Sequence, residues 1–154
     1  MPTTRKDLPV QEILLSEVLQ KVSNAKTRDE KIALLKKFNT QALRSILIWN
    51  FDESVKSAIP EGEVPFTAND APKGTEHTRL LKEQRNLYRF IKGGDNSLKQ
   101  MKREQLFIQM LEGLHAEEAE LLCLVKDKKL QDKYRVTRAV VEEAFPQIKW
   151  GNRG

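Results

Sequence analysis

The sequence predicts a single all-α domain of six or seven helices, packed as helical hairpins, spanning residues 1–154. Apolar residues recur with helical spacing along most of the chain, and residues that cap helix N-termini precede several of these segments. No segment shows the strict alternation of apolar and polar residues that is typical of a strand. We expect residues 1–8 and 151–154 to be flexible ends.

The first part of the chain contains three predicted helices, each with its own start signal. The first opens at Leu8-Pro9 and fades at Ser23. The second begins with a capping box, in which the Thr27 hydroxyl accepts from the Glu30 amide and the Glu30 carboxylate accepts from the Thr27 amide. The third is capped by Asn39-Thr40.

A Pro/Gly-rich insert over residues 60–74 then interrupts the helical pattern. Phe66 lies between two of its prolines, and there it either anchors the loop to the core or serves as a docking residue for a partner protein. Trp150, beyond Pro146, has the same two interpretations. We favour the anchoring role for Phe66 slightly and keep both residues as candidate partner-binding residues.

Four further helices are predicted after the insert. The fourth runs from Thr75 to Ile91 and stops at two glycines, and the fifth opens with a second capping box at Ser97. The sixth begins after a break at Gly113-Leu114-His115, and the last lies between Thr137 and Pro146.

An internal similarity connects the two halves of the chain. Shifting the sequence by the distance from Ile32 to Ile108 brings the apolar positions of residues 32–49 into register with those of residues 108–125. The match is one of pattern rather than identity. It indicates either two helical hairpins of the same kind or two unrelated hairpins that obey the same packing rules.

Composition excludes several classes of protein. The chain has one cysteine, which rules out an internal disulfide and fits a reducing compartment. Its apolar runs are far shorter than a membrane span, and no apolar stretch follows the first basic residues. We therefore expect a soluble cytoplasmic protein without membrane contact, with a net charge of +5 that permits binding to acidic partners.

Catalytic or cofactor-binding groups are sparse. His115 and Glu118 have the spacing of half a carboxylate metal site, but a role of His115 at a helix start is favoured far above it. Gly93-Gly94 follows a helix rather than a strand and precedes Asp95, so it does not resemble a phosphate loop. The sequence thus predicts no enzyme, no metal and no cofactor.

The predicted fourth helix has the most informative surface, because its basic residues gather opposite its apolar arc. Such a face is an ordinary solvated helix surface, a site for DNA or RNA, or a site for an acidic protein. We take nucleic acid as the leading functional hypothesis. The residues of the candidate site are Arg79, Lys82, Arg85, Arg89 and Lys92, with Lys99 and Lys102 beyond the glycines. A second basic group comprises Lys126, Lys128, Lys129, Lys133, Arg135 and Arg138.

Several segments resemble an uncharacterised family of small proteins from large tailed phages of marine bacteria, especially cyanobacteria. They are Glu61–Phe66, Lys102–Phe107, Glu112–His115 and Glu118–Leu122, and the likeness extends from about residue 30 onward. The resemblance implies a phage product that acts in the infected bacterial cytoplasm or is built into a particle. It implies binding to nucleic acid, to a phage protein or to a host protein, and it assigns no functional residue.

Overall fold

The computed structural model describes residues 13–68 and 78–151. Within these ranges the chain forms seven α-helices, two short 3₁₀ segments and one isolated bridge between Ser57 and Ile91, and no strand. The predicted all-α class is confirmed. In chain order the elements are α1 (Leu15–Asn24), α2 (Arg28–Lys37), α3 (Gln41–Phe51), α4 (Leu80–Glu83), the 3₁₀ segment η2 (Gln84–Phe90), α5 (Gln100–Gly113), α6 (Ala116–Lys126), the 3₁₀ segment η3 (Leu130–Asp132) and α7 (Arg138–Ala144).

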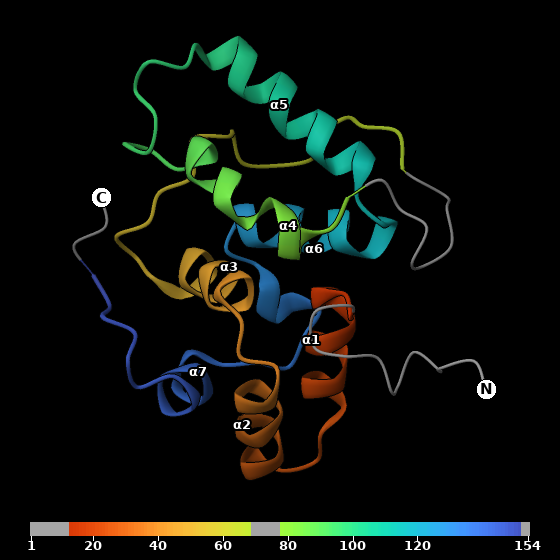
Figure 1. The fold of residues 1–154 in the computed structure, drawn as a ribbon, viewed down its shortest axis with the longest axis vertical. Helices are drawn as coiled ribbons and strands as arrows, with labels where there is room; N and C mark the ends of the chain where they lie inside the picture. The colour runs from red at the N-terminus through yellow and green to blue at the C-terminus, as the bar shows by residue number, and fades with distance from the viewer. Residues whose placement is uncertain (1–12, 69–77, 152–154) are drawn as a thin grey trace.

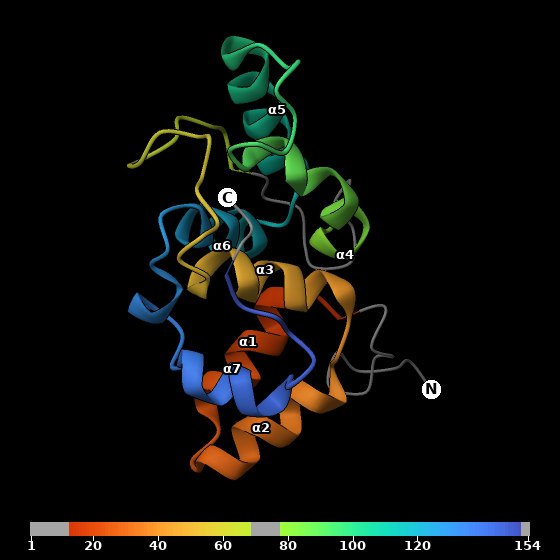
Figure 2. The same cartoon turned by 90° about the vertical axis from the view of Figure 1, so that its left-hand side faces the viewer.

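Helix α6 is the centre of the packing, since it contacts α1, α3 and α5 (Figure 1). Its residues Ala119, Leu121, Leu122 and Val125 are completely buried. They lie on more than one side of the helix, and a helix that is apolar on several sides has to be surrounded by other elements. Helices α2 and α7 pack together at one end of the molecule, and α5 lies at the other end (Figure 2). The α4–η2 segment lies between α3 and α5, because α4 and η2 both contact α3 and η2 also contacts α5.

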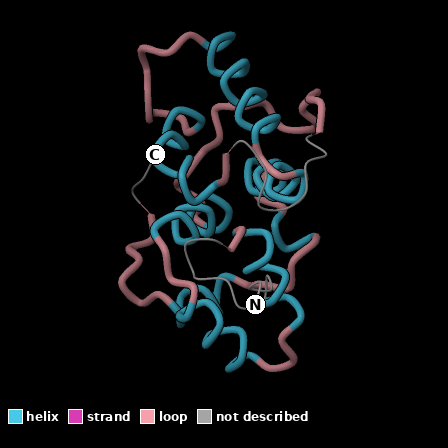
Figure 3. The backbone as a smooth tube through the Cα atoms, turned by 45° about the vertical axis from the view of Figure 1, so that its right-hand side comes forward, coloured by secondary structure: helices cyan, strands magenta, loops and turns pink. Residues whose placement is uncertain are grey.

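The two similar halves of the sequence pack differently. Helices α5 and α6 contact each other as a hairpin, whereas α2 packs mainly against α1 and α7, and α3 packs against α6 and α4. Figure 3, coloured by secondary structure, shows the described part of the chain as helices joined by loops. The short helix α7 buries Val140 and Val141 and therefore needs an apolar partner, which α2 supplies through its buried side. The internal similarity is thus one of sequence pattern rather than of equivalent hairpins.

Most predicted helix starts are found in the structure. The hydroxyls of Thr27, Thr40 and Thr137 accept from the amides three residues later, and His115 Nδ1 accepts from the Glu117 amide. The capping box at Thr27 is altered in one detail, because the Glu30 carboxylate accepts from the amide of Lys26 rather than from that of Thr27.

Three predicted boundaries were wrong. Helix α1 begins at Leu15, and Ile13 and Leu14 are not helical; the predicted start at Leu8-Pro9 lies outside the described residues. Ser97 does not cap α5, because its hydroxyl donates to Asp95 Oδ1 and the helix starts at Gln100. The predicted helix 75–91 is reduced to one turn of α4 followed by η2, and residues 75–77 lie outside the described part.

A buried carboxylate explains where α1 and α4 begin. Glu118 of α6 is fully buried, and its Oε2 accepts from the amide of Leu15 at 2.8 Å while its Oε1 accepts from the amide of Leu80 at 3.0 Å. The first amides of a helix lack partners within the helix and carry partial positive charge. The residues before these two helices, Leu14 and Arg79, form no side-chain cap, and Glu118 supplies the missing acceptors.

We expect Glu118→Ala to lower the free energy of unfolding by about 3–5 kcal/mol, because both buried amides lose their acceptor. Glu118→Gln keeps one carbonyl oxygen and should be less harmful. Urea denaturation measures both effects, and hydrogen exchange should show faster exchange at the amides of Leu15 and Leu80.

The matched control is Glu120→Gln on the same helix, which removes an exposed ion pair with Lys133 and should cost at most about 1 kcal/mol. If the Glu118 and Glu120 variants were equally stable, the carboxylate would not hold the two helix starts.

The lone thiol provides a second prediction. Burial in α6 raises the pKa of Cys123 from 9.0 to about 11, so its thiolate fraction near neutral pH falls roughly 100-fold. Alkylation by iodoacetamide at mildly alkaline pH should therefore be much slower in the native protein than in urea. Equal alkylation rates would show that Cys123 is in solvent.

Candidate nucleic-acid interface

The α4–η2 segment carries the predicted basic face, and most of it winds as a 3₁₀ helix instead of the expected α-helix. A 3₁₀ helix has three residues per turn, so positions three apart lie on the same side. Leu87 and Phe90 are buried, whereas Lys82, Arg85 and Tyr88 are exposed. A 3.6-residue period would place Tyr88 on the apolar arc of the predicted helix, and the tighter winding instead leaves it 46% exposed.

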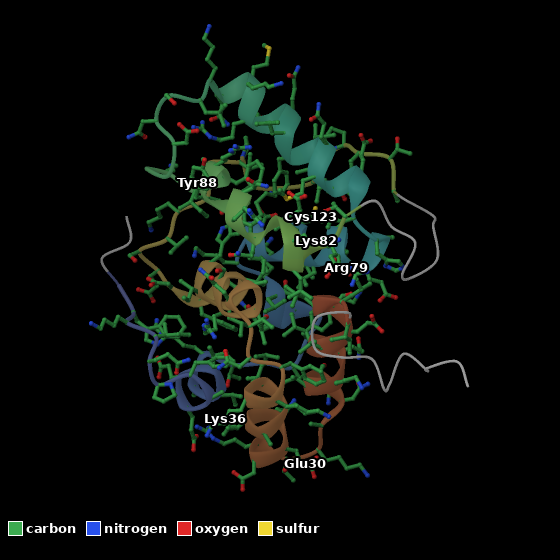
Figure 4. All side chains as sticks on the ribbon, viewed as in Figure 1. Glu30, Lys36, Arg79, Lys82, Tyr88 and Cys123 are labelled. Carbon is green, nitrogen blue, oxygen red and sulfur yellow. The ribbon has the colours of Figure 1, made fainter. Side chains whose placement is uncertain are left out.

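The candidate residues on this segment are not all equally available. Lys82, Arg85 and Lys92 are exposed, but Arg79 and Arg89 are partly buried. The Arg89 guanidinium lies over the ring of Tyr88, 5.7 Å from its centroid, with its Nε 3.4 Å from the phenol oxygen. Figure 4 labels Arg79 just before α4, Lys82 on α4 and Tyr88 on η2.

Lys99 and Lys102 belong to the same region because a single arginine joins α5 to η2. Arg103 Nε donates to the carbonyl of Arg89 at the end of η2, at 2.8 Å, and Nη2 donates to the carbonyl of Asp95 in the following loop, at 2.7 Å. The start of α5 is thereby held beside η2, where Lys99 just before the helix and Lys102 in its first turn are exposed.

Sequence reasoning missed a further cation, Lys56. The Lys92 amide donates to the Lys56 carbonyl at 2.8 Å, and the Ala58 amide donates to the Phe90 carbonyl at 2.7 Å. This short antiparallel pairing places the exposed Lys56 beside Lys92. Nothing in the local sequence signals the contact, because it joins two irregular segments that are distant in the chain. We call Lys56, Lys82, Arg85, Lys92, Lys99 and Lys102 the basic strip.

A groove of about 530 Å³ runs between α3 and η2, and we call it the η2 groove. Its apolar lining includes Ile48, Val55 and Leu87, while Arg85 and Lys92 contribute the positive charge. None of the described residues that line it is acidic. The polar uncharged side chains of the lining are Gln41, Ser45 and Gln84.

The second basic group is largely engaged in holding the fold. Lys126 is buried, and its ammonium donates to the carbonyls of Pro60 and Gly62 and to the Asp127 carboxylate. Lys128 donates to the carbonyls of Trp49 and Asp52 at the end of α3, and burial lowers the pKa of Lys128.

Exposed members of this group are also compensated. Lys133 pairs with Glu120 at 2.6 Å and Arg138 with Glu142 at 2.8 Å. Lys129 lies 3.9 Å from a carboxylate oxygen of Glu61, so this part of the surface carries charges of both signs.

The two candidate partner-binding aromatics pack against the core. Phe66 and Trp150 are both partly buried and contact the hydrophobic core, and Trp150 is covered by the Arg138 guanidinium at 4.6 Å from the ring centroid. This placement agrees with the anchoring interpretation of both residues. A partner-binding role for either one stays a prediction.

A larger cavity of about 890 Å³ lies where the end of α1 approaches α2 and α7. Two of its four basic residues are engaged: Arg28 pairs with Glu143 at 2.7 Å, and the Lys31 ammonium donates to the carbonyls of Val22 and Arg135. In the described ranges we find no group of three or more side chains suited to hold a metal ion. No helix there is long and apolar enough to cross a membrane.

Comparison with known proteins identifies one family. No curated protein and no solved structure matches this chain. The model of a family of unknown function, DUF6433, matches residues 18–132. The matched region includes the basic strip and the η2 groove and covers most of the 154 residues. The chain therefore belongs to DUF6433, a family of unknown function.

Proposed function

We propose that this protein binds DNA or RNA, alone or within a nucleoprotein complex, through the basic strip, and that it does so without catalysing a reaction. The observation that carries the proposal is the absence of compensating charge on the strip. Within the described residues, none of its six side chains forms an ion pair or a hydrogen bond.

Uncompensated cations favour a polyanion for an electrostatic reason. Each lysine or arginine that neutralises a phosphate releases a condensed counterion, which contributes affinity that falls with added salt. Most of the second basic group lacks this capacity, since its side chains, apart from that of the exposed Arg135, already contact carboxylates or carbonyls. The strip differs from an ordinary charged helix surface in that its six cations lie on adjoining segments that are far apart in the sequence.

A protein–protein adaptor or virion component is the alternative. It would use the 60–74 loop around Phe66 or the C-terminal Trp150, whose contacts with the core favour it less. The resemblance to a phage family supports the cytoplasm of an infected bacterium as the setting for either role.

We expect Lys82→Glu combined with Arg85→Glu to weaken binding to a duplex and to a single strand on the order of tenfold or more. Because two phosphate contacts are lost, the slope of log affinity against log salt concentration should also fall by roughly two units for the duplex. Fluorescence anisotropy titrations over a range of salt concentrations measure both quantities.

The matched control is Lys36→Glu combined with Lys37→Glu on α2, which makes the same change in net charge far from the strip (Figure 4 labels Lys36). Affinity should change much less in this variant. Equal weakening by the two double variants would show a response to net charge alone, and no binding by the unaltered protein would overturn the proposed function.

A further inference from the structure

We propose that the η2 groove holds an unpaired base, and that the protein therefore prefers single-stranded DNA or RNA to a duplex. This inference rests on the proposed function and adds the class of nucleic acid that the site selects. It is carried by one juxtaposition: an exposed aromatic ring on the edge of an uncompensated basic groove.

Tyr88 supplies a surface on which a base can stack. It lines the groove, and it and Met101 are the exposed large hydrophobic side chains among the described residues. The Arg89 guanidinium lies over the ring and so holds its orientation, while 46% of Tyr88 stays exposed and accessible to a second planar group. Stacking on such rings is tolerant of sequence, because every base has a π-face.

The lining of the groove suits a base better than an apolar side chain. Ile48, Val55 and Leu87 provide apolar contact, and the volume of about 530 Å³ lies within the range of small-ligand sites. The side chains of Gln41, Ser45 and Gln84 form no hydrogen bond with the described residues, so their donors and acceptors are available to the edge of a base.

The charges around the groove place the phosphates. Arg85 and Lys92 line the groove itself, and Lys56 lies beside Lys92 through the pairing of the two segments. A backbone that follows these cations leaves its bases directed toward Tyr88 and the apolar lining. An acidic peptide would match the charges but would leave the exposed ring without a planar partner.

A duplex cannot use this arrangement without distortion. Its bases are stacked and paired inside the helix, and extruding one costs a few kcal/mol. The basic strip can still contact duplex phosphates, but the groove then stays empty. Base binding in the groove therefore predicts a preference for single strands, which phosphate contacts with the basic strip alone do not predict.

The test uses the full chain with three fluorescein-labelled probes: an oligothymidylate of about 16 nucleotides, an oligouridylate and a duplex of the same length. We expect Tyr88→Ala to weaken binding of the single strands about 5- to 150-fold, the effect of losing one stacked base. Tyr88→Phe keeps the ring and should bind almost as the unaltered protein does. Duplex affinity should be the same in all three proteins.

A second variant probes the groove away from the ring. Ser45→Glu puts a carboxylate into the lining without changing Tyr88, and it should weaken single-strand binding while leaving the duplex affinity much less affected. Thermal melting checks that each variant is folded. The ratio between the two single-stranded probes shows whether DNA or RNA is the better ligand.

The outcomes separate the two proposals. If the unaltered protein binds duplex and single strand equally, and Tyr88→Ala weakens neither, the base site is overturned while the basic strip stands. If it binds no probe, the proposed function fails, and base binding with it. If Tyr88→Ala weakens duplex and single strands alike, the ring does not receive an unpaired base and the inference is wrong.

Discussion

The carboxylate of Glu118 lies in the interior of the molecule and accepts hydrogen bonds from the first amides of two helices, at Leu15 and at Leu80. A buried carboxylate is costly unless hydrogen-bond donors surround it, and helix N-termini provide donors together with a favourable dipole. Because Glu118 is on α6, the two helix starts are held against the central helix. The N-terminal part of the described chain and the α4–η2 segment are thus positioned by one side chain.

The position of Leu80 has consequences for the surface. It sets where α4 begins, and the chain then tightens into η2 rather than continuing as an α-helix. The three-residue period places Lys82, Arg85 and Tyr88 on the exposed side and Leu87 and Phe90 on the buried side. The ring of Phe90 packs edge-on against Phe107 of α5, with centroids 5.0 Å apart, which holds the segment against the core.

The basic residues divide between structural and exposed roles. Lys31, Lys126 and Lys128 donate to main-chain carbonyls, several of them near the ends of helices, where such groups lack helical partners. Arg103 does the same at the end of η2. A net charge of +5 is therefore a poor guide to the surface. What matters is which cations have no structural partner, and six of them lie together along the basic strip.

The sequence by itself determined the all-α class, the positions of most helices and the caps at Thr27, Thr40, His115 and Thr137, because helical periodicity and capping are local properties of the chain. It also identified most of the basic strip, although that the strip binds nucleic acid stays a prediction. Only the tertiary structure decided the rest: the role of Glu118, the winding of η2, the exposure of Tyr88 and the main-chain hydrogen bond that places Lys56 beside Lys92. Each depends on contacts between residues far apart in the chain, which no local pattern encodes.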